Sequence, residues 1–458
     1  MSFRQTILLC ALSFVLAIAA YLIVLALGVW MSSDGRITQN LRRSVEEGLL
    51  TEDVDSRPSN FGQTQHRFDM FSECVGLGVN LGNNDRSVLY RILATPYISF
   101  EQGGPAGIIS SHPCSDLVRA VTNQPKAELV YFRFWHGYQV YMRAVLSFTD
   151  LGRMRILNAI LMYGSLLYLC LKLEAWFGWQ ALPIFLLPYA FYSDMLSAPL
   201  VTVHAIPMAW TYLSIALGMR QLEQSRRPST GLFVLAFLSG SIYNFLSMLF
   251  TPQLAPALLA FMTIAAFLRW DGEGCKRLLA LWQAGWVALV WFLGFILTWF
   301  AKWTLAAFYF GLDAVRNSVL VAASGVNYRS YVRPRVHQLF GATLLVAGPW
   351  LLLCISAAIT VVTGIILFRK PPNGASRGAQ LRDCALLQSP LLIVIAWTEL
   401  MRYHSVEHSI FAQRAMILFI ILPLLALLLV RRVQSHEACP PRGRDAESTS
   451  AMKVMRFT

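Results

Sequence analysis

Chemically reactive side chains gather in three short stretches of a chain that is otherwise strongly apolar. Residues 68–74 read F-D-M-F-S-E-C, residues 131–138 read Y-F-R-F-W-H-G-Y, and residues 399–414 hold two histidines among arginines and glutamates. A carboxylate can act as a general base toward a hydroxyl, and arginine or histidine can hold a phosphate. These residue types indicate that the chain processes a substrate and does not merely anchor itself in a membrane.

The first stretch supplies two candidate catalytic residues, Asp69 and Glu73. In a helix the two carboxylates lie one turn apart on the same face. Either of them could remove the proton from an attacking hydroxyl. A solvated surface helix with two ordinary acids is the alternative, and spacing alone leaves it open.

The second stretch alternates aromatic residues with Arg133 and His136. An aromatic belt at the membrane surface with a snorkelling arginine explains the aromatic residues. It does not explain His136, which is followed by a glycine. We therefore expect Arg133 and His136 to bind phosphate, and Trp135 and Tyr138 to stack on a sugar or an acceptor.

The third stretch links two apolar segments and contains Arg402, His404, His408 and Arg414. His404 and His408 are spaced i, i+4 and could face one metal ion, but no third ligand is obvious. We interpret the group as binding the phosphate of a donor, and we assign no metal ligand. A divalent metal and a plain polar connector remain as alternatives.

Two further polar residues, His204 and Asn244, lie within apolar segments. Polar groups at membrane depth are costly and usually face a cavity or a partner. Both are candidates for contact with the sugar or the acceptor, and helix packing is the alternative role.

Composition defines the class of protein. Of 458 residues, 56% are hydrophobic and 14% are charged, against about 25% charged in typical soluble domains. Repeated apolar runs are long enough to cross a membrane core of about 30 Å. The net charge of +13 lies largely in short loops, as the positive-inside rule expects, so we exclude nucleic acid as a partner.

The expected fold is all-α and polytopic, with about ten transmembrane helices and both termini in the cytoplasm. Residues 1–432 form the transmembrane domain, and residues 433–458 form a disordered cytoplasmic tail. Residues 31–150 form a long periplasmic loop with helices on the membrane surface, and residues 303–337 form a second periplasmic loop. This arrangement places all three reactive stretches on the periplasmic side.

Cysteine positions support this topology. Of eight cysteines, only Cys74 and Cys114 fall in the predicted external loops. Two cysteines exposed to an oxidising compartment are expected to pair. We predict a disulfide between them, which would fix the loop that carries Asp69 and Glu73.

The architecture resembles the GT-C class of integral-membrane glycosyltransferases. The motifs F-S-E-C at 71–74, R-F-W-H-G-Y at 133–138 and H-S-V-E-H-S-I-F-A-Q-R at 404–414 are similar to those of bacterial proteins that transfer arabinofuranose to type IV pilins. The resemblance implies a polyprenyl-phosphate sugar donor and a catalytic carboxylate in the first external loop, at Asp69 or Glu73. The adjacent acid pair usual in the class is absent.

We therefore expect an inner-membrane enzyme that transfers a sugar from a polyprenyl-phosphate donor to a periplasmic protein or glycan. Direct displacement at the anomeric carbon is the expected mechanism, and no cofactor is assigned. A flippase or transporter of a lipid-linked sugar is the alternative. It would need polar groups spread to both faces of the bundle, whereas here they gather at one. A non-catalytic assembly or export subunit is a third reading.

Overall fold

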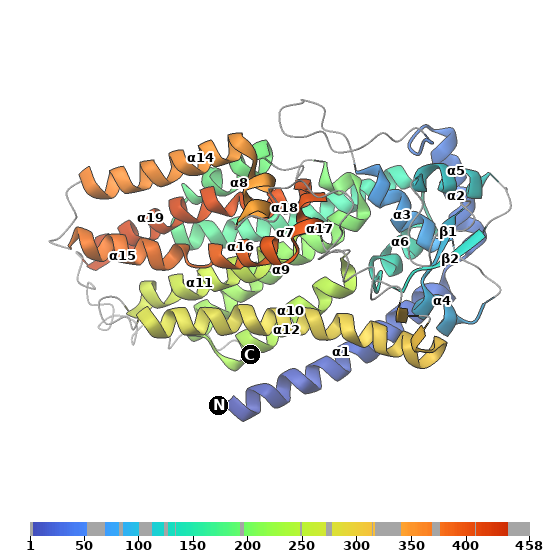
Figure 1. Ribbon diagram of the computed structural model, residues 1–458, viewed down its shortest axis with the longest axis horizontal. Helices are drawn as coiled ribbons and strands as arrows, with labels where there is room; N and C mark the ends of the chain where they lie inside the picture. The colour runs from blue at the N-terminus through green and yellow to red at the C-terminus, as the bar shows by residue number, and fades with distance from the viewer. Residues whose placement is uncertain are drawn as a thin grey trace, which may run out of the picture.

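Long apolar helices lie side by side in this computed structural model, and a lobe of short elements closes one end of the bundle (Figure 1). The first helix, α1 (Phe3–Met31), begins at the opposite end and reaches the lobe with its C-terminus. The residues that the structure describes are 3–52, 69–81, 86–99, 112–122, 127–132, 134–192, 197–247, 250–271, 277–313, 315–316, 340–368, 376–407 and 409–437.

The central part of the bundle follows the lobe in sequence. Its helices are α7 (Leu151–Phe177), α8 (Ala181–Tyr192), α9 (Thr202–Ser225), α10 (Thr230–Leu246), α11 (Leu254–Asp271) and α12 (Arg277–Phe310). The short 3-10 helix η1 (Ala198–Leu200) leads directly into α9.

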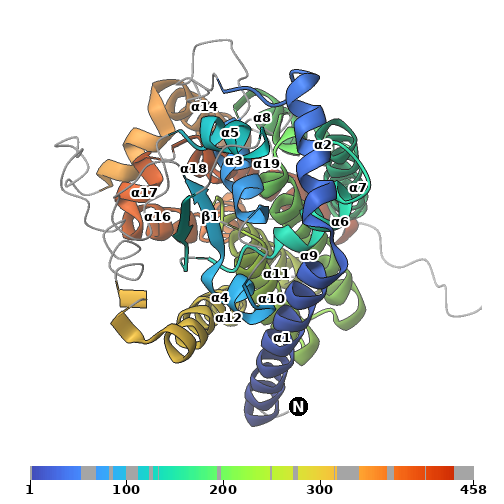
Figure 2. The same cartoon turned by 90° about the vertical axis from the view of Figure 1, so that its right-hand side faces the viewer.

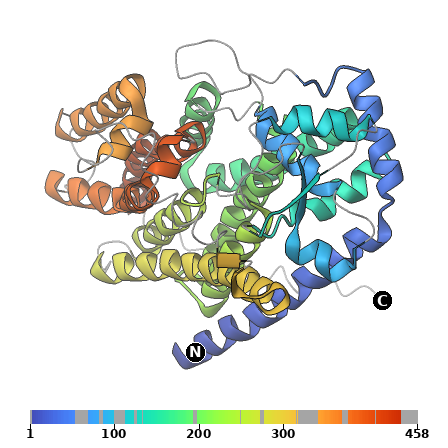
Figure 3. The same ribbon diagram turned by 45° about the vertical axis from the view of Figure 1, so that its right-hand side comes forward.

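The C-terminal helices form a group on one side of the bundle, coloured orange and red in Figure 3. They are α14 (Gly341–Phe368), α15 (Arg377–Gln388), α16 (Leu391–Leu400), α17 (Arg402–Glu407), α18 (Ser409–Met416) and α19 (Leu418–Glu437). α19 ends at Glu437, five residues into the predicted disordered tail, so the start of the tail at residue 433 was placed too early. Residues 438–458 lie outside the described part of the chain.

The lobe is formed by the predicted first external loop. It contains α2 (Asp34–Glu46), α3 (Met70–Asn80), α4 (Val88–Ala94), β1 (Pro96–Ser99), α5 (Pro113–Val121), β2 (Ala127–Val130) and α6 (Tyr138–Leu146). The two strands pair antiparallel, with Pro96 opposite Val130, and this small sheet was not predicted. Viewed from the lobe end, α3 and α5 lie in front of the bundle (Figure 2).

Capping side chains and ion pairs fix the lobe elements. Ser33 and Ser87 accept backbone N–H groups at the starts of α2 and α4, which satisfies donors that a helix start leaves free. Asp34 then pairs with Arg91 of α4 and with Arg143 of α6. One carboxylate thus ties three lobe helices together.

Close helix packing within the bundle depends on two glycines. A Cβ at Gly240 of α10 would collide with the backbone carbonyl of Trp291 in α12, and a Cβ at Gly294 would collide with that of Phe237. Small residues let helix backbones approach in this way inside membranes. At these two positions the backbones of α10 and α12 are therefore in close contact.

The expected number of spans is not confirmed. Among the described residues, five helices are long and apolar enough to cross a membrane, or six if the bent α14 is one span. α8, α10 and α11 are shorter apolar helices, and α9 has the length but is not counted because of its polar residues. α12 also continues to Phe310, past the predicted loop boundary at residue 303.

The disulfide connects α3 to α5. Cys74 and Cys114 are joined, with 5.0 Å between their Cα atoms and 40 residues between them in sequence. Both residues are buried in the lobe. The pairing expected from the sequence is therefore present, and it fixes the helix on which Glu73 lies.

We predict that the lobe faces the periplasm and that the opposite end of the bundle faces the cytoplasm. Glu47, after α2, and Ser225, at the end of α9, are exposed at the two ends. With the free cysteines replaced, Glu47→Cys should react with a membrane-impermeant maleimide in intact cells. Ser225→Cys should react only after permeabilisation. The reverse pattern would invert the topology.

Candidate functional site

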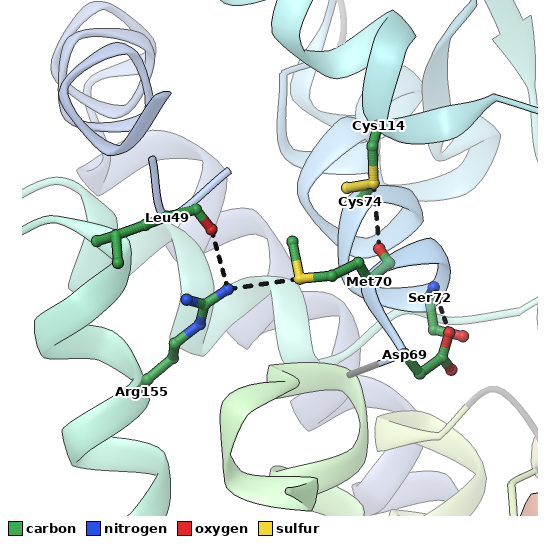
Figure 4. The surroundings of a disulfide bond; sticks show 7 residues. All are labelled: Leu49, Asp69, Met70, Ser72, Cys74, Cys114 and Arg155. Carbon is green, nitrogen blue, oxygen red and sulfur yellow. Dashed lines mark hydrogen bonds between the residues drawn. A yellow bond between two sulfur atoms is a disulfide. The ribbon is translucent and has the colours of Figure 1, made fainter. Parts of the chain in front are cut away.

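The two candidate carboxylates lie at the start of α3, on the face of the lobe that meets the bundle. Asp69 is the N-cap of α3, and its Oδ1 accepts the backbone N–H of Ser72 at 3.1 Å. Glu73 follows one turn later. Asp69 is 8% exposed and Glu73 is fully buried, so neither is an ordinary surface acid. Figure 4 shows Asp69 and Ser72 beside the disulfide.

Asp69, His204 and Arg414 form a chain of polar contacts from the lobe into the bundle. Asp69 Oδ2 lies 3.2 Å from His204 Nε2 in α9, and Arg414 Nη2 in α18 lies 3.1 Å from His204 Nδ1. A guanidinium can only donate. His204 Nδ1 must therefore accept, which leaves the ring proton on Nε2, where it faces Asp69.

This environment keeps Asp69 ionised. Burial acts to raise the pKa of Asp69, but the contacts with His204 and Ser72 outweigh it and hold the pKa below its ordinary value. A hydrogen bond to the charged form of a carboxyl favours that form. Asp69 is therefore a carboxylate at neutral pH, as a proton acceptor must be.

Glu73 caps the start of α9. Its Oε2 accepts the backbone N–H of Thr202 at 2.7 Å, and its Oε1 accepts the Thr202 hydroxyl at 2.9 Å. Asn158 of α7 donates in turn to Thr202 Oγ1. Val201, the N-cap of α9, supplies no capping side chain. A carboxylate from the lobe thus takes the capping position, where the helix dipole also favours negative charge.

Burial dominates the acidity of Glu73. It raises the pKa of Glu73 to about 7, although Arg155 and the donors of Thr202 act to lower it. Arg155 approaches from α7 and donates to the carbonyl of Leu49 at 3.3 Å and to Met70 Sδ at 3.5 Å (Figure 4). Both Glu73 oxygens accept hydrogen bonds from Thr202, at the start of α9.

Glu73 should make the stability of the protein depend on pH. Its pKa rises from 4.5 to about 7 on folding, so the folded state binds the proton more tightly. The apparent melting temperature should therefore fall between about pH 4.5 and pH 7 and then level off. Glu73→Gln should flatten this part of the profile, measured by tryptophan fluorescence in detergent. An unchanged slope in the variant would assign the effect to another group.

His136 lies in a strained turn at the start of α6. Its φ of 55° is unusual for a residue other than glycine, and its side chain is fully buried. Nδ1 lies 2.6 Å from the Tyr138 hydroxyl. Gly137 follows because a Cβ there would collide with the ring of Phe245. Burial lowers the pKa of His136 well below its usual value, and the charge of Lys302 lowers it further, so the imidazole is neutral.

The residues expected to contact sugar are buried. Trp135 donates from Nε1 to the Thr298 carbonyl at 2.7 Å and packs against Tyr21 and Phe245. Tyr138 and Asn244 are also buried. Trp135 packs as a core residue, so its predicted stacking on a sugar is not supported. His204, expected to touch the sugar or the acceptor, lies between Asp69 and Arg414.

The structure describes only part of the third stretch, residues 399–414. Arg402 donates to the carbonyl of Glu399 at 3.2 Å. His404 lies in α17 with its side chain undescribed, while Arg133 and His408 lie outside the described residues. Among the described side chains no group of three or more His, Cys, Asp or Glu could hold a metal. Of the predicted phosphate ligands, the structure brings Arg414 next to the catalytic candidates.

Sequence reasoning missed Arg155, Thr202 and Lys302. The first two act through tertiary contacts that no local pattern reveals. Lys302 carried a signal, because it is a lone charge between Ala301 and Trp303 in an apolar run. A charge at such a position is a functional hypothesis by default. In the structure it is fully buried.

Comparison with protein-family models, curated proteins and solved structures finds no significant match to this chain. The functional conclusion therefore depends on the geometry of the site.

Proposed function

We propose that this protein is a membrane glycosyltransferase that moves a sugar from a polyprenyl-phosphate donor to an acceptor on the periplasmic side of a bacterial inner membrane. The observation that carries the proposal is the Asp69–His204–Arg414 chain. It joins two of the reactive stretches, far apart in sequence, at one end of a helix bundle. Such a convergence of buried charged groups is expected of a site and is costly as mere packing.

Asp69 is the proposed general base. It is ionised, is the more exposed of the two acids, and has its Oδ2 3.2 Å from His204 Nε2. As the acceptor hydroxyl attacks the anomeric carbon, its proton passes to Asp69 and a new glycosidic bond forms. The bond between the sugar and the phosphate breaks, and the lipid phosphate leaves with the electron pair.

Glu73 is proposed as a positioning residue. Its two contacts with Thr202 fix the start of α9, and His204 lies only two residues further along that helix. Moving Glu73 would therefore move the imidazole that faces Asp69. We therefore propose Asp69 as the base and Glu73 as the residue that positions α9.

The location of the site favours a lipid-linked donor. The lobe carries Asp69 and covers one end of helices that are long and apolar enough to cross a membrane. A substrate with its reactive phosphate at the membrane surface and its tail among the helices fits this position. The sugar, arabinofuranose by resemblance, and the acceptor, a pilin or an envelope glycan, belong to the proposal.

Reconstituted protein tests the function directly. Purified wild-type protein should transfer sugar from a synthetic polyprenyl-phosphate donor to an acceptor, with release of the lipid phosphate measured by mass spectrometry. In a parallel vesicle assay, a fluorescent lipid-linked sugar should stay in its leaflet. Movement between leaflets without transfer would instead establish the flippase.

A further inference from the structure

A buried lysine lies beside the strained turn of His136, and it is not used by the chemistry described above. Lys302 of α12 is fully buried, and its Nζ donates to the Ile92 carbonyl at 2.7 Å and to Thr95 Oγ1 at 3.0 Å. Nζ also lies 5.5 Å from the centre of the Trp135 ring. The lysine thus connects α12 to the end of α4 and to the residue that precedes His136.

No carboxylate pairs with Lys302 among the described residues. An ammonium has three N–H donors, and the contacts of Lys302 in the described part use two of them. A buried charge without a counter-charge is costly. The fold therefore places an amino group with a spare N–H donor at this position, with no carboxylate paired to it in the described part of the chain.

His136 presents a second polar atom at the same place. Its Nε2 is buried and has no hydrogen-bond partner in the described part of the chain. When the Tyr138 hydroxyl donates to Nδ1, the ring proton lies on Nε2, which is then an available donor. The backbone N–H of Tyr131 donates to the carbonyl of Ala94, next to Thr95, and the Tyr131 ring lies 5.1 Å from the His136 ring, centre to centre. The His136 ring therefore lies near the residue that accepts from Lys302.

Backbone strain marks the same site. Thr95, which accepts from Lys302, has φ 49°, and His136 has φ 55°. These are two of the four non-glycine residues with positive φ among those described. Strain of this kind persists only where the surrounding structure enforces it, and it is common at ligand sites.

We propose that Lys302 and His136 form a subsite for the phosphate group of a lipid phosphate monoester. The ammonium supplies the counter-charge, and His136 Nε2–H and the third N–H of Lys302 donate to phosphate oxygens. A phosphate fits better than a neutral ligand because it carries charge and offers several acceptor oxygens. The lipid source rests on the proposed function; a phospholipid headgroup or inorganic phosphate would share the chemistry.

Binding of polyprenyl phosphate to the purified full-length protein tests this subsite without turnover. Wild-type protein should bind polyprenyl phosphate and not the corresponding polyprenol. Lys302→Met keeps the length and removes the charge, so it should weaken binding on the order of 10- to 100-fold. Lys172→Met, which removes a lysine paired with Glu223 between α7 and α9, is the matched control and should bind as wild type.

His136→Asn gives a second variant if the first does not fold. Asparagine tolerates a positive φ, so the turn is retained while Nε2 is lost. It should weaken binding by about tenfold. Equal affinity of wild type and the folded variants would overturn the proposal. Displacement of the lipid by millimolar inorganic phosphate or by phospholipid at equal potency would assign the subsite to that source and overturn the lipid-donor assignment.

The outcomes separate this inference from the proposed function. If the protein transfers sugar and Lys302→Met binds the lipid normally, the subsite is wrong and the function stands. If wild type binds polyprenyl phosphate through Lys302 but transfers no sugar, the subsite stands and the function fails.

Discussion

Replacing Asp69 with asparagine should lower the rate of sugar transfer by about 10²–10⁴, the usual contribution of a general base. An amide keeps the size of the side chain, and its oxygen can still accept the Ser72 N–H at the start of α3. It cannot take a proton from the acceptor. The measurement is transfer from a synthetic polyprenyl-phosphate sugar by purified protein with its disulfide intact.

Asp150→Asn is the matched control for this prediction. Asp150 caps α7 by accepting the Arg153 N–H at 2.9 Å, so it shares the capping role of Asp69 without the contact to His204. The control should retain wild-type activity. Full activity of Asp69→Asn would exclude Asp69 as the base, and Glu73→Gln would then test the other candidate.

Replacing Arg414 with glutamine should lower kcat by roughly 10²–10³, comparable to the loss of one electrostatic donor at an active site. Arg414 donates to His204 Nδ1 and so keeps the ring proton on the side of Asp69. Without Arg414, the ring proton of His204 can move from Nε2 to Nδ1. Nε2 would then present a lone pair to the Asp69 carboxylate. Steady-state kinetics with varied donor concentration measure the effect.

The kinetic constants distinguish the two roles considered for Arg414. If it positions His204, kcat falls while the KM for the donor stays nearly constant. If it binds the donor phosphate directly, as the sequence suggested, the KM rises instead. Arg269→Gln, which removes an arginine at the C-terminal end of α11 that donates to the Trp176 carbonyl, should change neither constant. If both kcat and the KM for the donor are unchanged in Arg414→Gln, this arginine does not belong to the site.

The sequence by itself determined the class of fold and the disulfide. Apolar runs of sufficient length form helices whatever their neighbours, because backbone groups in lipid must be satisfied within the helix. The positions of Cys74 and Cys114 were enough to predict the disulfide, because only these two cysteines fell in the predicted external loops. The number of spans is not confirmed, since α8 and α10, among the described helices, are apolar but short.

The candidate site was only partly readable from sequence. Residue type singled out Asp69, His204 and Arg414, because charged and polar groups are conspicuous in an apolar chain. Their assembly was not readable: His204 and Arg414 are 210 residues apart, and packing of α9 against the lobe and α18 brings them together. The different contacts of the two acids could not be predicted from the sequence either, since Glu73 accepts a hydrogen bond from Thr202, 129 residues away in the chain.

Only the tertiary structure therefore decided which polar groups meet and which are buried. Trp135 illustrates the limit, because its neighbours in sequence suggest an interfacial aromatic and its neighbours in space make it a core residue. Lys302 illustrates the converse, since a lysine that sequence reasoning did not single out becomes a fully buried donor beside a strained turn. Local chemistry fixes what a residue can do. Desolvation and partners, which are set by contacts between distant segments, fix what it does.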